Sequence, residues 1–268
     1  MGIVNVTPDS FSDGGLYLDA DAAIAHGLEL AAAGAAVIDV GGESTRPGAE
    51  PVDADEELRR VVPVVAGLVA GYATVSIDTT KSTVARAALD AGAVMVNDVS
   101  GGVADPEMLA TVADSGAAYV AMHMRGTPQT MRDRAEYVDV VDDVCRELGA
   151  RVDAALAAGI DARALLADPG IGFAKTADHN LVLLAALPEI AARAGAPLVV
   201  GASRKSFLAR FAGNGADVAA RDDATLATTV WAFEHGAAMV RVHDVACSRR
   251  AAELLDLMER ATPEGVAA

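Results

Sequence analysis

The chain has 268 residues, of which 52% are hydrophobic, and its 38 acidic residues against 21 lysines and arginines give a formal net charge of −17. This balance argues against general binding to nucleic acid or anionic membranes, and the apolar content argues against a disordered or fibrous protein. Only Cys145 and Cys247 occur, too few for a disulfide framework. With no visible signal peptide and no apolar run near the ~20 residues that span a bilayer, we expect a cytoplasmic protein.

Apolar runs and amphipathic stretches alternate along the whole chain. An apolar run between helical patterns predicts a buried parallel strand. Strands are expected near residues 2–6, 36–40, 74–78, 93–97, 117–122, 164–168, 197–202 and 238–242. Helices are expected over Ala20–Ala33, Asp55–Ala70, Ser82–Ala91, Pro106–Ser115, Ala135–Ala158, His179–Ala192, Arg221–Glu234 and Ser248–Arg260.

Strands and helices in this alternation predict an α/β fold, a (β/α)8 TIM barrel with residues 1–268 as a single domain. A doubly wound open sheet is the alternative, although the G-x-G-x-x-G turn expected after its first strand is missing. Pro63 should kink its helix or split it into two pieces. The segment 204–223 should hold a short helix, a loop and a longer helix.

Two loops and the chain start complete this outline. The long connections at residues 7–18 and 41–53 are rich in Gly, Pro, Ser and Asp, and are candidates for mobile lids over a pocket. Met1 directly precedes the first strand, so either further residues precede it or the bottom of the barrel is less covered than usual.

Polar residues end one apolar run after another, and in a barrel such positions belong to the active site. Asp78, Asn97 and Asp168 end the third, fourth and sixth expected strands. Each alone could cap a helix or begin a turn. Together they would bury charge that costs several kcal/mol unless it is paired. We therefore expect them to face a flat ligand with an edge rich in N–H donors.

Basic residues follow the last two expected strands. Arg204 and Lys205 come after the seventh, and Arg241 and His243 lie on one side of the eighth. These loops commonly bind phosphate in barrels, although a solvated basic helix start is the alternative. Asn5 could contact Mg²⁺ held mainly by substrate phosphates and water, or could cap its own loop. With no nucleophile elbow and no zinc spacing, the residues predict binding of a polar heterocycle and an anionic group without covalent catalysis.

Seven motifs, in order and with compatible spacing, resemble those of the dihydropteroate synthase family. They are residues 1–15, 39–48, 76–79, 97–102, 168–175, 201–207 and 241–245. The resemblance implies a (β/α)8 barrel and a transferase that joins (7,8-dihydropterin-6-yl)methyl diphosphate to 4-aminobenzoate. The products would be 7,8-dihydropteroate and diphosphate, for folate synthesis.

The resemblance also assigns residues. Asp78, Asn97, Asp168 and Lys205 would hold the pterin, with Arg241 over its face. Asn5, Arg241 and His243 would hold the diphosphate, with Asn5 as the Mg²⁺ ligand. Thr45, Arg46, Pro47, Phe173 and Ser203 would surround 4-aminobenzoate, and Thr45 is assigned to the pterin diphosphate as well.

For catalysis, Asp78, Lys205 and His243 are the candidates, with Mg²⁺ as cofactor. The expected route is dissociative: diphosphate leaves first, a pterin methylene cation forms, and the amine then attacks. By the same resemblance, sulfonamides should compete with 4-aminobenzoate and the protein should be a homodimer. The rival functions are a pterin-dependent methyltransferase barrel and a catalytically silent pterin-binding paralogue.

Overall fold

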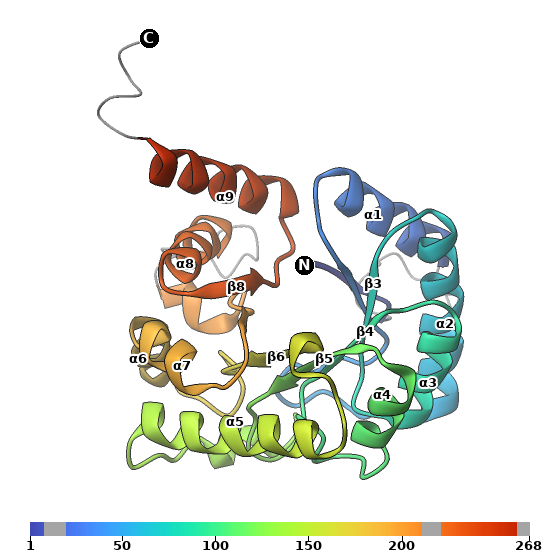
Figure 1. The fold of residues 1–268 in the computed structure, drawn as a ribbon, viewed down its shortest axis with the longest axis horizontal. Coiled ribbons are helices and arrows are strands. Elements are labelled where there is room, and N and C mark those ends of the chain that lie inside the picture. The colour runs from blue at the N-terminus through green and yellow to red at the C-terminus, as the bar shows by residue number, and fades with distance from the viewer. Residues whose placement is uncertain (8–19, 211–220, 262–268) are drawn as a thin grey trace.

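The computed structural model describes residues 1–7, 20–210 and 221–261. Its eight parallel strands follow one another around a sheet in chain order (Figure 1). They are β1 (Gly2–Asn5), β2 (Ile38–Gly41), β3 (Val75–Asp78), β4 (Met95–Asp98), β5 (Ala118–Met122), β6 (Leu165–Asp168), β7 (Leu198–Val200) and β8 (Ala237–Val240). A bridge between Gly2 and Val242, with Ile3 N donating to Val242 O at 3.1 Å, closes the sheet. The predicted barrel is confirmed.

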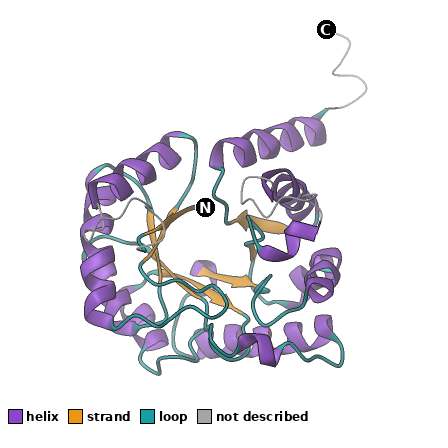
Figure 2. Ribbon diagram, turned by 180° about the vertical axis from the view of Figure 1, so that it is seen from behind, coloured by secondary structure: helices purple, strands orange, loops and turns teal. Residues whose placement is uncertain are grey.

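Helices form a ring outside the strands (Figure 2). They are α1 (Ala20–Ala32), α2 (Ala54–Ala70), α3 (Ser82–Asp90), α4 (Met108–Ser115), α5 (Val140–Ala157), α6 (Ala177–Ala185), α7 (Leu187–Arg193), α8 (Asp222–Glu234) and α9 (Val245–Arg260). Short 3₁₀ turns, η1 (Met131–Arg134), η2 (Ala162–Ala164) and η3 (Ser206–Arg210), join them. In the described part of the chain, no helix is long and apolar enough to cross a bilayer.

The single helix expected over His179–Ala192 is wrong. The chain breaks at Ala186 into α6 and α7, and Pro188 lies in the first turn of α7. Proline has no N–H to donate to the carbonyl four residues earlier, so a helix ends before it and a new one starts at it.

Of the two outcomes expected at Pro63, a kink or a split, the split is wrong, because α2 is one helix that contains this proline. Pro63 is exposed, whereas Val61, Val64 and Val65 are fully buried against the barrel. Packing of this buried face holds the helix together, and the carbonyl that loses its partner lies toward solvent.

The interior of the barrel changes from apolar to polar along the strands. Met1, Val37, Met95, Val120 and Val199 form a buried plug. Because side chains alternate along a strand, the next inward positions lie two residues further on, at Asp39 after Val37 and at Asn97 after Met95. The C-terminal ends of the strands therefore carry a polar layer on an apolar base.

The segment after β7 contains the expected short helix, η3, and the expected longer helix, α8. The predicted loop between them lies largely outside the described residues. The same is true of most of the first long connection, residues 8–19.

Candidate active site

Three carboxylate and amide side chains gather around Arg241 inside the barrel. The guanidinium donates from Nε to Oδ2 of Asp39 at 2.6 Å and from Nη2 to Oδ2 of Asp78 at 2.7 Å. Asn97 donates from Nδ2 to the same Asp39 oxygen at 2.9 Å. Residues of β2, β3, β4 and the end of β8 thus meet in one hydrogen-bonded group.

Asp168 lies on the far side of this group, at the end of β6. Its Oδ1 accepts from Gly170 N at 2.7 Å. A Cβ placed on Gly201 would lie 3.9 Å from Asp168 Oδ2 and 3.7 Å from Arg241 Cβ. The missing side chain at Gly201 therefore leaves open the space where the acid and the cation approach each other.

Lys205 brings a second cation to the opening of the barrel at the C-terminal ends of the strands, which we call the mouth. Its Nζ donates to Ile171 O and lies 4.5 Å from the centre of the Phe173 ring. Burial lowers the pKa of Lys205 to about 8, and the charges of Asp168 and Asp78 oppose this shift. The acids from the middle of the chain and the cations from its end are thus within electrostatic reach of each other.

Burial also raises the pKa of the two buried acids. The pKa of Asp78 rises to about 7, because desolvation outweighs the opposing charge of Arg241 and Asp39 adds a like charge. The pKa of Asp168 rises through desolvation, against the charge of Lys205. A ligand that donates N–H groups here would favour the ionised carboxylates over the neutral acids.

His243 contacts Ser203 at the edge of the mouth. Ser203 Oγ lies 2.9 Å from His243 Nδ1 and accepts from His243 N at 3.2 Å. Burial lowers the pKa of His243 to about 4, and the charges of Arg204 and Arg241 act in the same direction. The imidazole is therefore neutral at pH 7 and can act as a hydrogen-bond donor rather than as a cation.

The loop between β2 and α2 lies beside this mouth. Glu43 closes the loop by accepting from Val52 N at 3.3 Å. Further along, Gly48 N donates to Pro128 O at 2.9 Å. The charge of Arg46 acts on His243, which places the loop within electrostatic reach of the end of β8.

A family model for pterin binding enzymes matches residues 1–243. A dihydropteroate synthase from Mycobacterium leprae is 52% identical over 270 residues, which cover 98% of this chain and 94% of that one. The chain belongs to the dihydropteroate synthase family.

Solved dihydropteroate synthase structures share the whole fold. A structure from Xanthomonas albilineans with 4-aminobenzoic acid matches with a TM-score of 0.91 and 46% identity, covering 97% of this chain and 93% of that one. Another from the same organism, in complex with 7,8-dihydropteroate, matches with a TM-score of 0.86 and 42% identity over the same shares.

The structure brings together the residues predicted for a dihydropteroate synthase site. Asn5 pairs in register with Gly41, Gly41 with Asp78, and Asp78 with Asn97, so these positions lie side by side across β1 to β4. The remaining predicted residues surround these positions or lie beside them: Asp168, Phe173, Ser203, Lys205, Arg241 and His243, with Thr45, Arg46 and Pro47 in the neighbouring loop. Their roles toward each substrate stay predictions.

Arg204 departs from the expected basic cluster. It donates to both carboxylate oxygens of Asp222, at 2.7 and 3.0 Å, and its backbone φ is 57°. Thr225 Oγ1 accepts from Arg204 N at 3.0 Å, which holds this left-handed conformation. The charge of Arg204 is thus already paired on the outer side of the motif.

Two groups of residues take part in this site without a predicted role. Asp39 lies two residues before the end of its strand and is fully buried, and no rule of strand endings points to it. Lys81 pairs with both Glu43 and Glu57, which joins the base of the β2–α2 loop to α2 and to the start of α3. Their sequence signals were charge inside otherwise apolar or loop segments and, for Asp39, its place at the start of the motif 39–48.

The donor set fits a magnesium ion that is carried mainly by the substrate. In the described part of the chain, no group of three or more His, Cys, Asp or Glu side chains could hold a metal. The half-buried Asn5 amide forms no hydrogen bond with any described residue, so its oxygen is free to act as a hard ligand. Mg²⁺ prefers oxygen ligands and commonly keeps water and substrate phosphates in its shell.

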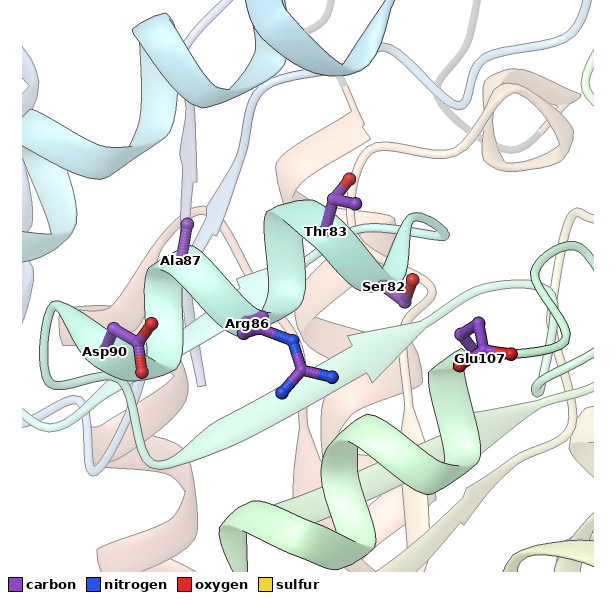
Figure 3. A pocket seen from close by; sticks show the side chains of 6 residues that line it. All are labelled: Ser82, Thr83, Arg86, Ala87, Asp90 and Glu107. Atoms are coloured by element: carbon purple, nitrogen blue, oxygen red, sulfur yellow. The ribbon is translucent and has the colours of Figure 1, made fainter.

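A separate groove of about 380 Å³ lies between α3 and the start of α4, among the outer helices (Figure 3). Ser82, Thr83, Arg86, Ala87, Asp90 and Glu107 line it. It contains none of the residues at the strand ends, and Arg86 is already bonded to Thr111 Oγ1 at 3.0 Å.

Proposed function

We propose that this chain joins (7,8-dihydropterin-6-yl)methyl diphosphate to 4-aminobenzoate and releases 7,8-dihydropteroate and diphosphate for folate synthesis. One observation carries the proposal. Buried acids from β3 and β6 share a mouth with cations that follow β7 and β8, in a chain that belongs to the dihydropteroate synthase family. Such a mouth suits a ligand with a donor-rich ring at one end and an anion at the other.

The acids and Asn97 would bind the pterin ring. Its ring N–H and amino groups would donate to Asp78, Asp168 and Asn97, while Lys205 would donate to the ring carbonyl and a ring nitrogen. A hydrogen bond to a charged group contributes ~1.5–3 kcal/mol, so a few of them fix both affinity and orientation. Arg241 would lie over the pterin face.

Diphosphate would leave before the amine attacks. The bond between the methylene carbon and the diphosphate oxygen breaks, its electron pair stays with the oxygen, and a pterin methylene cation remains. Arg241 and the neutral His243 would donate hydrogen bonds to the departing anion, and the Asp78 carboxylate would stabilise the cation through the ring. Mg²⁺, held by Asn5, diphosphate and water, would neutralise negative charge on the leaving group.

The amine of 4-aminobenzoate would then attack the methylene carbon, and the new C–N bond would be followed by loss of one nitrogen proton to water or the released diphosphate. Thr45, Arg46, Pro47, Phe173 and Ser203 would position it, and Thr45 would also contact the pterin diphosphate. A neutral aromatic amine needs orientation more than activation against such a cation. Exchange between bridging and nonbridging diphosphate oxygens without 4-aminobenzoate would support this order, and a strict need for the amine before cleavage would contradict it.

Diphosphate release tests the function directly. Folded protein is incubated with the pterin diphosphate, 4-aminobenzoate and Mg²⁺, and release is followed with and without each component. We expect release that yields 7,8-dihydropteroate and depends on 4-aminobenzoate for net product. No release by protein that binds the pterin would favour a silent paralogue. Methyl transfer from a methylated pterin, supplied in a separate incubation, would favour the methyltransferase.

We further propose a homodimer in the cytoplasm. Leu254, Leu257 and Met258 are exposed apolar side chains on α9, and Trp231 on α8 is partly exposed. Apolar side chains in such number on neighbouring helices suit a self-interface. Analytical ultracentrifugation should give twice the mass of one 27.2 kDa chain, and a single-chain mass at micromolar protein would contradict the dimer.

A further inference from the structure

Asp39 holds a central place in the polar layer without facing the solvent. It lies on β2, and its Oδ2 accepts two hydrogen bonds, from Arg241 Nε at 2.6 Å and from Asn97 Nδ2 at 2.9 Å. Along the sheet, β2 is two strands away from β4, which carries Asn97, and two away from β8, which precedes Arg241. One carboxylate oxygen thus connects the two sides of the mouth.

We propose that Asp39 is a positioning residue for the pterin diphosphate. It orients the Asn97 amide toward the ring and the Arg241 guanidinium toward the diphosphate, without contacting either part of the substrate. This inference rests on the proposed function, because it names which protein group prepares the two halves of that site.

Asp39 decides which end of the Asn97 amide faces the ligand. An amide has a donating NH₂ and an accepting oxygen, and only the NH₂ can face a carboxylate favourably. With Nδ2 bonded to Asp39, Oδ1 is left as the end that can accept from a ligand. The reversed amide would bring its oxygen against Asp39 Oδ2 and present a donor to a ring edge that itself donates.

Asp39 and Asp78 together hold the guanidinium of Arg241. Nε bonds to Asp39 and Nη2 to Asp78, whereas Nη1 forms no hydrogen bond with any residue that the structure describes. Two attachment points fix the plane of the group and leave Nη1 as the donor for an anion. Fixing a long side chain before binding reduces the conformational entropy that association would otherwise cost.

The other oxygen of Asp39 shows that the residue is not optimised for stability. Oδ1 is buried and has no hydrogen-bond partner among the residues that the structure describes, and the same holds for Oγ of Ser76, the register partner of Asp39 on β3. A buried carboxylate with an unsatisfied oxygen is costly, and the apolar Val37 occupies the preceding inward position on the same strand. Ser76 therefore offers a matched control. It is as buried as Asp39 and pairs with it in register, but it is bonded to neither Asn97 nor Arg241.

The test compares Asp39→Asn with Ser76→Ala in the full chain. Calorimetry measures the affinity of each variant for a pterin without diphosphate and, separately, for inorganic diphosphate with Mg²⁺. We expect Asp39→Asn to weaken both ligands by about tenfold or more, since both charged hydrogen bonds lose their anion. Ser76→Ala should leave both affinities within about twofold, because no bond is removed.

Three results would overturn the positioning role. The first is that Asp39→Asn binds both ligands as tightly as the parent protein. The second is that Asp39→Asn weakens the binding of only one ligand. The third is that Ser76→Ala weakens the binding of both ligands as much as Asp39→Asn does. Turnover by the parent protein is measured in parallel. If the parent protein turns over and Asp39→Asn binds both ligands with unchanged affinity, only the positioning role is refuted. If the parent protein binds both ligands tightly but does not turn over, only the proposed function is refuted.

A second variant covers the case in which Asp39→Asn does not fold. The exchanged pair Asp39→Asn with Asn97→Asp keeps the net charge and one amide–carboxylate hydrogen bond, now donated from residue 39. Residue 39 still offers an oxygen to Arg241, and residue 97 still offers an acceptor to the ring. We expect it to bind both ligands within about fivefold of the parent. Folded exchanged protein that binds neither ligand would contradict the role of the pair.

Discussion

Ser203 contacts both the backbone and the imidazole ring of His243. The Ser203 hydroxyl accepts from His243 N at 3.2 Å and lies 2.9 Å from His243 Nδ1. The imidazole is neutral at pH 7, so only one ring nitrogen carries a hydrogen. We assign the hydroxyl hydrogen of Ser203 to the bond with Nδ1, and in this tautomer Nε2–H is a donor toward the mouth. A residue predicted for the 4-aminobenzoate pocket thereby orients a group predicted to bind diphosphate.

Substitution Ser203→Ala should weaken the binding of diphosphate. Without the hydroxyl, His243 loses its fixed tautomer and presents an acceptor to the anion part of the time. We expect the inhibition constant of inorganic diphosphate to rise about two- to tenfold, the value of one neutral hydrogen bond. Product-inhibition kinetics measure it, with the exposed Ser206→Ala as control. An unchanged constant in Ser203→Ala would mean that His243 is oriented by other contacts.

The pH dependence of kcat/KM for the pterin diphosphate should have two limbs. The ionised fraction of Asp78 rises as pH rises through its pKa of about 7, so activity should increase there. The protonated fraction of Lys205 falls as pH rises through its pKa of about 8, so activity should decrease there. We therefore expect a narrow optimum between these values in the free enzyme.

Lys205→Arg separates the two limbs. Arginine stays charged at all accessible pH values, so the alkaline limb should move upward while the acid limb stays near pH 7. If the acid limb disappears in the variant His243→Gln, the titrating group of that limb is His243 instead of Asp78. That outcome would contradict the lowered pKa of this imidazole.

Arg46→Ala should act on one substrate more than on the other. Arg46 is exposed in the β2–α2 loop, outside the hydrogen-bonded group around Arg241. We expect KM for 4-aminobenzoate to rise about tenfold, the effect of losing one charged hydrogen bond, with KM for the pterin diphosphate changed less than twofold. Equal increases in steady-state kinetics would mean that the loop contacts both substrates alike.

Lys81→Met should destabilise the fold strongly. Glu57 has no exposed side-chain surface, and Lys81 is its charged partner. Removing one partner of a buried ion pair costs about 3–5 kcal/mol in free energy of unfolding. Urea unfolding measures the loss, and the double variant Lys81→Met with Glu57→Met should regain most of it. A double variant as unstable as Lys81→Met would show that the pairing of Glu57 is not the cause.

The strand endings could be predicted because local sequence defines them. Asp78 and Asp168 follow apolar runs directly, and a closed parallel barrel brings all such ends to one face. Asp39 could not be recognised this way. Its hydrogen-bond partner Arg241 lies 202 positions further along the chain, so only the closed barrel shows the contact.

The different outcomes at the two helix prolines have one cause. Pro63 and Pro188 each follow a helical pattern, yet Pro63 lies within one helix and Pro188 begins a new one. The difference depends on whether buried neighbours hold the helix across the proline, as Val61, Val64 and Val65 do in α2. Sequence periodicity indicates an apolar face but not how firmly that face packs.

A crystal structure with a bound pterin diphosphate analogue and Mg²⁺ tests the central geometry most directly. We expect the ring against Asp78, Asn97 and Asp168, with Lys205 at its carbonyl edge and the diphosphate at Arg241 and His243. An analogue bound in the outer groove between α3 and α4, or with its ring and diphosphate exchanged within the mouth, would contradict it.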